Sequence, residues 1–83
     1  MAERYIIIGR STCPFCTMAE DLLIASKIEH IFLDYAHKTE ILEDYKQFHD
    51  QPTVPIILSN NLETGLVQKV GGYTDLLECV GER

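Results

Sequence analysis

The chain carries the stretch Tyr5-Ile6-Ile7-Ile8-Gly9-Arg10-Ser11-Thr12-Cys13-Pro14-Phe15-Cys16 near its amino terminus. The apolar residues from Tyr5 to Ile8 are typical of a strand that is buried on both faces and ends at Gly9. From Phe15 onward apolar residues recur at helical spacing, and Pro14 suits the first position of a helix, where its missing N–H costs nothing. This stretch therefore predicts a buried strand, a short loop and a helix that begins beside two cysteines.

The remaining residues continue to alternate between extended and helical patterns, with no linker and no internal repeat. Their spacing predicts helices over 15–26, 39–48 and 74–80, with Thr39 and Thr74 as caps of the last two. Further strands are expected over 29–34, 54–58 and 66–70, with Pro55 at a strand start or edge and a turn over 59–65. The helix residues expected to face the core are Phe15, Met18, Ala19, Leu22, Leu23 and Ser26, then Ile41, Leu42, Tyr45 and Phe48, then Leu76, Leu77 and Val80.

The predicted order of elements is β-α-β-α-β-β-α, an α/β fold in a single domain over residues 1–83. The first β-α-β unit requires a right-handed crossover and parallel strands. The last two strands are close enough in sequence to form an antiparallel hairpin. A four-stranded mixed sheet with helices on both faces satisfies these conditions.

Charge and composition exclude several classes of protein. Thirteen Asp and Glu residues against seven Lys and Arg give a net charge of −6, which disfavours binding to nucleic acid or to an anionic membrane. No apolar stretch approaches the roughly 20 residues that span a bilayer. The apolar run at the amino terminus is too short for a secretory signal, so we expect a cytoplasmic protein.

The Cys13-Pro14-Phe15-Cys16 motif points to redox chemistry. Residues i and i+3 at a helix start are about 5 Å apart, a separation that a disulfide can bridge. Cys13 falls at the predicted helix cap, where unpaired N–H groups and the helix dipole stabilise a thiolate, and Arg10 adds positive charge. Cys13 is therefore the expected nucleophile, and Cys16 is expected to be less exposed.

A zinc site is the main structural alternative to a redox-active disulfide. It needs two further ligands, and the other candidates, which are Cys79, His30, His37 and His49, form no second compact pair. We therefore expect no metal. Cys79 lies in an apolar helical stripe and is expected to be a small buried hydrophobe, the histidines to be solvated surface groups, and Phe15 to be either core or an aromatic rim beside the thiols.

The chain resembles the glutaredoxins, small members of the thioredoxin-fold family. The resemblance rests on Cys13-Pro14-Phe15-Cys16, Thr53-Val54-Pro55 and Gly71-Gly72-Tyr73-Thr74-Asp75-Leu76, in the family's order. It implies a thioredoxin-like fold, Cys13 as nucleophile, Cys16 as resolving thiol and Pro55 as a cis-proline. The residues that it implies for glutathione binding are Arg10, Phe15, Gln47, Thr53, Val54, Pro55, Gly72, Thr74 and Asp75.

The resemblance divides these binding residues by the part of glutathione that each would hold. Arg10 and Gln47 resemble groups that bind the glycine carboxylate, and the Val54 backbone resembles the group that pairs with the peptide backbone. Thr74 and Asp75 match the pair at the γ-glutamyl end.

The sequence departs from the pattern in four places. Phe15 replaces a Tyr, a Gly usual shortly before Thr-Val-Pro is replaced around Asp50, and Pro52 replaces an Arg found in some relatives. The segment 59–70 is also longer than in many small relatives, which predicts an extended hairpin.

The function implied is glutathione-dependent reduction of protein–glutathione mixed disulfides and protein disulfides, that is, electron transport in cell redox homeostasis by a monomer. Its partners are glutathione, as co-substrate, and the oxidised proteins. One alternative is an electron donor, for example to ribonucleotide reductase, that thioredoxin reductase recycles. Another is an iron–sulfur carrier made of two chains and two glutathiones, against which Pro14 argues, because in the family this proline accompanies redox forms.

Overall fold

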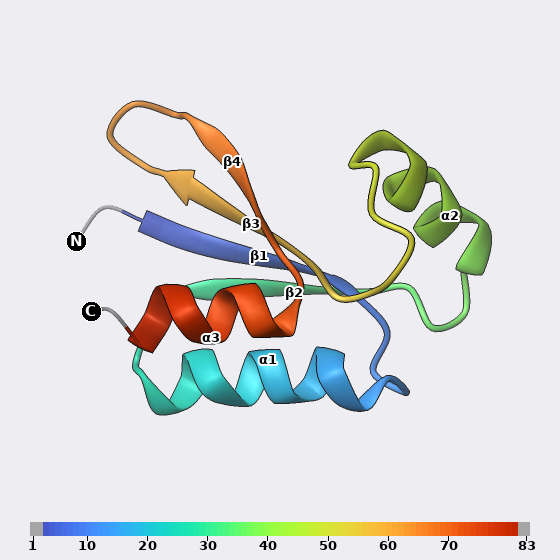
Figure 1. Cartoon of the computed structure of the whole chain (residues 1–83), viewed down its shortest axis with the longest axis horizontal. Coiled ribbons are helices and arrows are strands. Elements are labelled where there is room, and N and C mark those ends of the chain that lie inside the picture. Colours follow the sequence, from blue (N-terminus) through green and yellow to red (C-terminus); the bar gives the residue numbers. More distant parts are fainter. Residues whose placement is uncertain (1–2, 82–83) are drawn as a thin grey trace.

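Four strands and three helices follow one another in the order that the sequence predicts. A computed structural model of the chain describes residues 3–81. The elements are β1 (Glu3–Gly9), α1 (Pro14–Ala25), β2 (His30–Asp34), α2 (Thr39–Phe48), β3 (Ile56–Asn61), β4 (Val67–Gly71) and α3 (Tyr73–Gly81) (Figure 1). Within residues 3–81, no helix has the length and apolar character needed to cross a membrane.

The strands form one mixed sheet in the order β2-β1-β3-β4. β1 pairs in parallel with β2 and antiparallel with β3, and β3 and β4 form the expected antiparallel hairpin. β1 lies inside the sheet, and its side chains on both faces, from Tyr5 to Ile8, are buried or half-buried. The predicted parallel and antiparallel pairs are both confirmed.

The helices cover both faces of the sheet, as predicted. α1 and α3 lie side by side along one face, and α2 stands against the other, near one end of the strands (Figure 1). Alternate residues of β1 supply the two cores. The residues buried beneath α1 and α3 are Tyr5, Ile7, Ala19, Leu23, Ile57 and Leu76, and those beneath α2 are Ile8, Leu42, Ile56 and Leu58.

The buried helix faces are narrower than the sequence predicts. In α1 the buried residues are Cys16, Ala19 and Leu23, whereas Phe15, Met18 and Ser26 are exposed. In α2 only Leu42 is fully buried, and Phe48 is 83% exposed because α2 touches the sheet through one side. Leu77 of α3 is also exposed. The prediction that Met18, Ser26, Phe48 and Leu77 face the core is therefore wrong, and of the two expectations for Phe15 the core position is wrong.

Several predicted boundaries and caps are wrong by a few residues. β3 begins at Ile56, directly after Pro55, which has no N–H to donate to the neighbouring strand. It continues to Asn61 because Asn61 pairs with Glu3 of β1. The residues 59–61 are therefore strand and not turn. Lys38, and not Thr39, is the cap residue of α2 and makes no side-chain hydrogen bond there.

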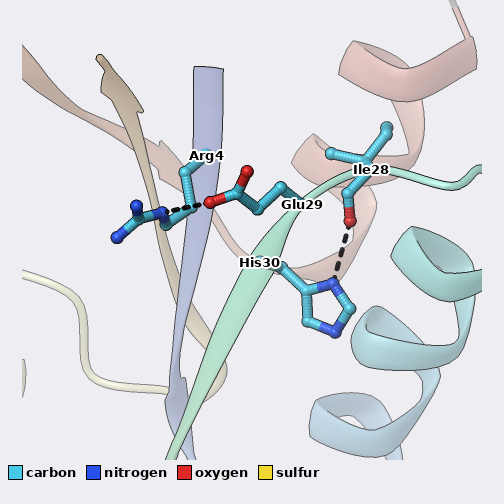
Figure 2. A network of polar contacts seen from close by, with 4 residues as sticks. All are labelled: Arg4, Ile28, Glu29 and His30. Atoms are coloured by element: carbon cyan, nitrogen blue, oxygen red, sulfur yellow. Dashed lines mark hydrogen bonds and ion pairs between the residues drawn. The ribbon is translucent and has the colours of Figure 1, made fainter. Parts of the chain in front are cut away.

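An ion pair joins the start of β1 to the segment that precedes β2, and a second polar contact lies within that segment and the start of β2 (Figure 2). Arg4 Nε lies 2.8 Å from Glu29 Oε2, and His30 Nδ1 lies 2.9 Å from the Ile28 carbonyl oxygen. His30 Nε2 also approaches Glu20 Oε2 at 3.5 Å. His30 is half-buried among these partners, so the expectation of a solvated surface histidine is wrong at this position.

Cys79 is exposed, contrary to the prediction that it is buried. α3 turns Leu76 into the core, and Cys79, three residues later, lies at the flank of the buried stripe with its Sγ 3.3 Å from the Tyr5 hydroxyl. The helical spacing was interpreted correctly as amphipathic, but it did not locate the edge of the covered face.

Candidate active site

Cys13 caps α1 and Pro14 occupies the first helical position, as predicted. The Cys13 backbone is extended, with φ −96° and ψ 120°, and its carbonyl oxygen accepts hydrogen bonds from the Cys16 and Thr17 N–H groups at 3.1 Å each. Its side chain makes no capping hydrogen bond to the helix. The thiol thus sits at the positive end of α1 with backbone donors around it.

The surroundings of Cys13 favour its thiolate. Only 7% of the residue is exposed, and this burial acts to raise the pKa of Cys13. The Cys16 thiol, the backbone N–H groups of Cys16 and Phe15, and the charge of Arg10 act in the opposite direction and prevail, so that the pKa of Cys13 lies below its ordinary value of 9.0. Cys13 therefore has the property expected of a nucleophile.

Cys16 has the opposite character although it lies one turn away. It is fully buried, and burial together with the adjacent Cys13 raises the pKa of Cys16 to about 12 despite a hydrogen bond from the Arg10 N–H at 3.5 Å. Cys16 therefore stays a neutral thiol that donates to the Cys13 sulfur. Cys16 is the less exposed of the two thiols, at 0% against 7% for Cys13, as predicted.

Gly9 makes room for the buried thiol. A Cβ on Gly9 would lie 2.5 Å from Cys16 Sγ and 3.8 Å from Pro55 Cα, so only a residue without a side chain fits between them. The sequence identified Gly9 as the end of a strand but missed this role. The signal was present in the chain, since a glycine at the carboxyl end of a buried strand often marks a close approach.

Asp34 anchors the loop between β1 and α1 and was also missed. One carboxylate oxygen accepts hydrogen bonds from the Ser11 N–H at 2.9 Å and the Ala36 N–H at 3.0 Å. The Ser11 side chain, followed by these two N–H groups, lowers the pKa of Asp34. Gly9 and Asp34 are paired neighbours at the carboxyl ends of parallel strands. That placement was the available signal, because carboxyl ends of parallel strands share one edge of the sheet.

A hollow of about 370 Å³ contains most of the predicted binding residues. The Val54–Pro55 peptide bond is cis, as the resemblance implies. Phe15 is 57% exposed, and its ring centroid lies 6.1 Å from that of Tyr73, so Phe15 forms an aromatic rim and not core. The residues that line the hollow are Phe15, Thr53, Val54, Pro55, Gly72, Tyr73, Thr74 and Asp75, of which only Tyr73 was not predicted as a site residue.

The side chain that pairs with a free backbone N–H at the start of α3 is Asp75, and not Thr74 as predicted. The helix begins at Tyr73, and Asp75 Oδ2 accepts a hydrogen bond from the Gly72 N–H at 2.9 Å. This is the carboxylate half of a capping box. Gly71 has a φ of +125°, a conformation that residues with a side chain rarely adopt, and a Cβ there would overlap the Asp75 carboxylate. Both the backbone conformation and the lack of space therefore require glycine at this position.

Two predicted residues lie outside this hollow. Gln47 is exposed on α2 and lines a separate depression together with Gln51 and Pro52. Arg10 is half-buried and acts on the two thiols through its backbone N–H and its charge. Over residues 3–81, no three His, Cys, Asp or Glu side chains are grouped so that they could hold a metal ion.

Comparison with known proteins identifies the family. The glutaredoxin family model matches residues 5–62. Glutaredoxin 1 of Escherichia coli (strain K12) is 34% identical over 86 aligned residues, covering 93% of this chain and 92% of that protein. The structure of reduced E. coli glutaredoxin superposes with a TM-score of 0.68 at 32% identity, covering 96% of this chain and 95% of that one. A buckwheat glutaredoxin–glutathione complex gives 0.73 at 14% identity, covering 96% and 70%.

These similarities, with a dithiol at the start of a helix beside a mixed sheet, define a thioredoxin-like fold with thiol–disulfide oxidoreductase chemistry. The chain belongs to the glutaredoxin family. Both conclusions agree with the fold and the resemblance expected from the sequence.

Proposed function

We propose that this protein is a glutathione-dependent oxidoreductase that reduces protein–glutathione mixed disulfides and protein disulfides. The observation that carries the proposal is the pairing of an acidic Cys13 thiol with a neutral, buried Cys16 thiol at the head of α1. A lowered pKa raises the thiolate fraction of Cys13 at a given pH and makes Cys13 a better leaving group, and the two halves of a thiol–disulfide exchange require these two properties.

In the one-thiol route, the Cys13 thiolate attacks the glutathionyl sulfur of a mixed disulfide. The S–S bond of the substrate breaks, and the protein sulfur leaves as a thiolate that takes a proton from water. A second glutathione, as its thiolate, then attacks the glutathionyl sulfur on Cys13 and releases glutathione disulfide. The net reaction converts the mixed disulfide and one glutathione into the reduced protein and one glutathione disulfide, and Cys13 returns unchanged.

In the two-thiol route, the Cys13 thiolate attacks one sulfur of a protein disulfide and forms a mixed disulfide with the substrate. The S–S bond of the substrate breaks, and its other sulfur leaves as a thiolate that takes a proton from water. The Cys16 thiol then attacks the Cys13 sulfur, and its proton passes to the departing substrate thiolate. The high pKa of Cys16, about 12, keeps this thiol protonated until that step. Two glutathiones reduce the resulting Cys13–Cys16 disulfide and become glutathione disulfide, so that electrons and protons balance.

Glutathione suits the hollow beside the thiols. Val54 lies on its wall outside any strand and can pair with a peptide-like backbone, and the Asp75 carboxylate can accept from an ammonium group. The start of α3 presents backbone donors to a carboxylate. The buckwheat glutaredoxin of the same fold was solved as a complex with glutathione, which supports the same co-substrate here.

The test is deglutathionylation of a model protein by single-cysteine variants. Cys13→Ser should be inactive, whereas Cys16→Ser should retain much of the one-thiol reaction. Activity in Cys13→Ser would defeat the assignment. If thioredoxin reductase, and not glutathione, reduces the oxidised protein during turnover, the protein is instead an electron donor of the first alternative class. If the protein is brown after anaerobic purification, it is an iron–sulfur carrier.

We also propose a cytoplasmic monomer, because a dithiol reductant works where glutathione keeps thiols reduced. Sedimentation of the reduced protein and fractionation of the cells that produce it test the two parts of this proposal separately.

A further inference from the structure

Gln51 lies where the chain leaves α2 and runs toward β3, in the segment that Figure 1 draws in yellow. Its position is fixed from two sides. The Gln51 N–H donates to the Lys46 carbonyl oxygen at 2.9 Å, and the nearby His49 carbonyl oxygen accepts from the Lys69 ammonium group at 2.7 Å. The first bond ties Gln51 to α2 and the second ties the end of α2 to β4.

From this fixed base the Gln51 side chain reaches two carbonyl groups of the following loop. Its Nε2 lies 3.2 Å from the Thr53 oxygen and 2.9 Å from the Pro55 oxygen. Carbonyl oxygens only accept, so the amide nitrogen, with two N–H donors, is the end of the side chain that must face them. One side chain therefore satisfies both carbonyl groups that flank Val54.

The loop itself has little backbone support. Within residues 3–81, the backbone–backbone hydrogen bonds outside helices and strands include none to residues 52–54. Yet Thr53, Val54 and Pro55 form one wall of the hollow, and the Pro55 oxygen lies 3.9 Å from the place where a Cβ on Gly72 would be. A shift of this loop would therefore change the shape of the hollow.

We propose that Gln51 is a positioning residue, which holds the backbone of Thr53–Pro55 in place so that the peptide groups of Val54 are ready to pair with an extended substrate. This inference rests on the proposed function, in which glutathione lies in the hollow. It assigns substrate binding, and not thiol acidity, to Gln51, because no polar atom of Gln51 takes part in the interactions that shift the pKa of either active-site cysteine. Holding a binding surface in its bound geometry improves binding by removing the cost of ordering it.

The first test replaces Gln51 with Met, which keeps the length of the side chain and removes the donors. We expect Gln51→Met to raise KM for a glutathionylated peptide about tenfold, with kcat nearly unchanged. The pH dependence of Cys13 alkylation should stay that of the unmodified protein. Gln68→Met, a change at an exposed position of β4, is the matched control and should leave KM unchanged.

The second test separates hydrogen bonding from shape. Gln51→Glu has nearly the same shape but turns carboxylate oxygens toward two carbonyl oxygens, so it should raise KM at neutral pH more than Gln51→Met does. If Gln51 only filled space, Gln51→Glu would be the better tolerated of the two. That order of the variants, or an unchanged KM in Gln51→Met, overturns the inference.

Backbone order parameters from NMR keep the inference testable without any substrate. The order parameters of Thr53 and Val54 should fall in Gln51→Met relative to the unmodified protein, while those of β1 should not change. Unchanged order parameters at Thr53 and Val54 overturn the inference even if glutathione is the co-substrate. An unmodified protein that shows no turnover with glutathione refutes the proposed function alone, and the comparison of order parameters then decides the role of Gln51.

Discussion

The amino termini of α1 and α3 meet at the hollow, yet they treat their free backbone donors in opposite ways. The first turns are in contact there, with the rings of Phe15 and Tyr73 6.1 Å apart. At α1 the Cys13 side chain makes no capping hydrogen bond of the usual kind, and the N–H groups of Phe15 and Cys16 act on its sulfur and lower its pKa. At α3 the chain supplies its own anion, because the Asp75 carboxylate accepts from the Gly72 N–H.

The difference shows how one kind of local structure serves two purposes. Donors around a sulfur stabilise its thiolate and create a reactive group, whereas a donor paired with the Asp75 carboxylate stabilises the start of the helix. Substitutions at the α1 terminus should consequently change thiol reactivity. Substitutions at the α3 terminus should change stability and, under the proposed function, glutathione binding, but not thiol reactivity.

The largest effect is expected when the sulfur at the α1 terminus is removed. Cys13→Ser should reduce deglutathionylation by at least about a thousandfold, because a hydroxyl is not ionised near neutral pH and is a poor nucleophile for sulfur. Turnover of a glutathionylated peptide measures the loss. Cys79→Ser, at the exposed cysteine of α3, is the control and should leave turnover unchanged.

The two thiols of α1 should titrate far apart. Iodoacetamide should label Cys13 with a midpoint below the ordinary pKa of 9.0, whereas Cys16, with a pKa of about 12, should stay unlabelled through neutral pH. Labelling of both thiols at the same pH would contradict the assignment. Mass spectrometry of the labelled peptides distinguishes the two sites.

The same shifts link folding stability to pH, with opposite signs. The pKa of Cys13 is lowered by folding, so its contribution to stability is present above pH 9.0 and is lost as the pH falls through the lowered value. The pKa of Cys16 is raised by folding, so its contribution is present below pH 9.0 and is lost as the pH rises toward about 12. Denaturant unfolding of Cys13→Ala and Cys16→Ala across pH measures each contribution.

A substitution at Gly71 should disrupt the α3 terminus. Gly71→Ala places a Cβ at φ +125° and into the Asp75 carboxylate, and we expect it to lower the free energy of unfolding by about 2–3 kcal/mol. Gly65→Ala is the matched control, since Gly65 also has a positive φ, 77°, but nothing lies within 4 Å of the added Cβ. It should cost only about 1 kcal/mol. Equal losses would show that the Asp75 contact is unimportant.

The smallest expected effect follows removal of the α3 capping carboxylate. Asp75→Ala should lower the free energy of unfolding by about 0.5–1 kcal/mol, since it leaves the Gly72 N–H without this acceptor. Glu78→Ala, one turn further along the helix, should change stability less. Cys13 alkylation should be unchanged in both variants, and a shifted alkylation profile in Asp75→Ala would show that the two helix ends are not independent.

Local patterns predicted the backbone framework well. The order of elements, the Cys13 cap and Pro14 at the first helical position depend on residues close in sequence, so periodicity and turn chemistry suffice. The hollow was found through motifs, since Thr53–Pro55 and Gly72–Asp75 are far apart in sequence and only the resemblance joined them. The boundaries of the elements were predicted less accurately, because pairing with β1 extends β3 to Asn61, which local spacing does not show.

The amino-acid sequence by itself determined that a strand leads into a helix with a cysteine sulfur at its head, beside unpaired N–H groups, because chain direction and the start of the helix settle both locally. Only the tertiary structure decided which side of each helix is covered, which exposed Phe15, Phe48 and Cys79 and enclosed Cys16 against Gly9. It also decided where the Gln51 amide reaches. The physical reason is that burial and close contact depend on neighbours brought together by the sheet, whose positions no local spacing specifies.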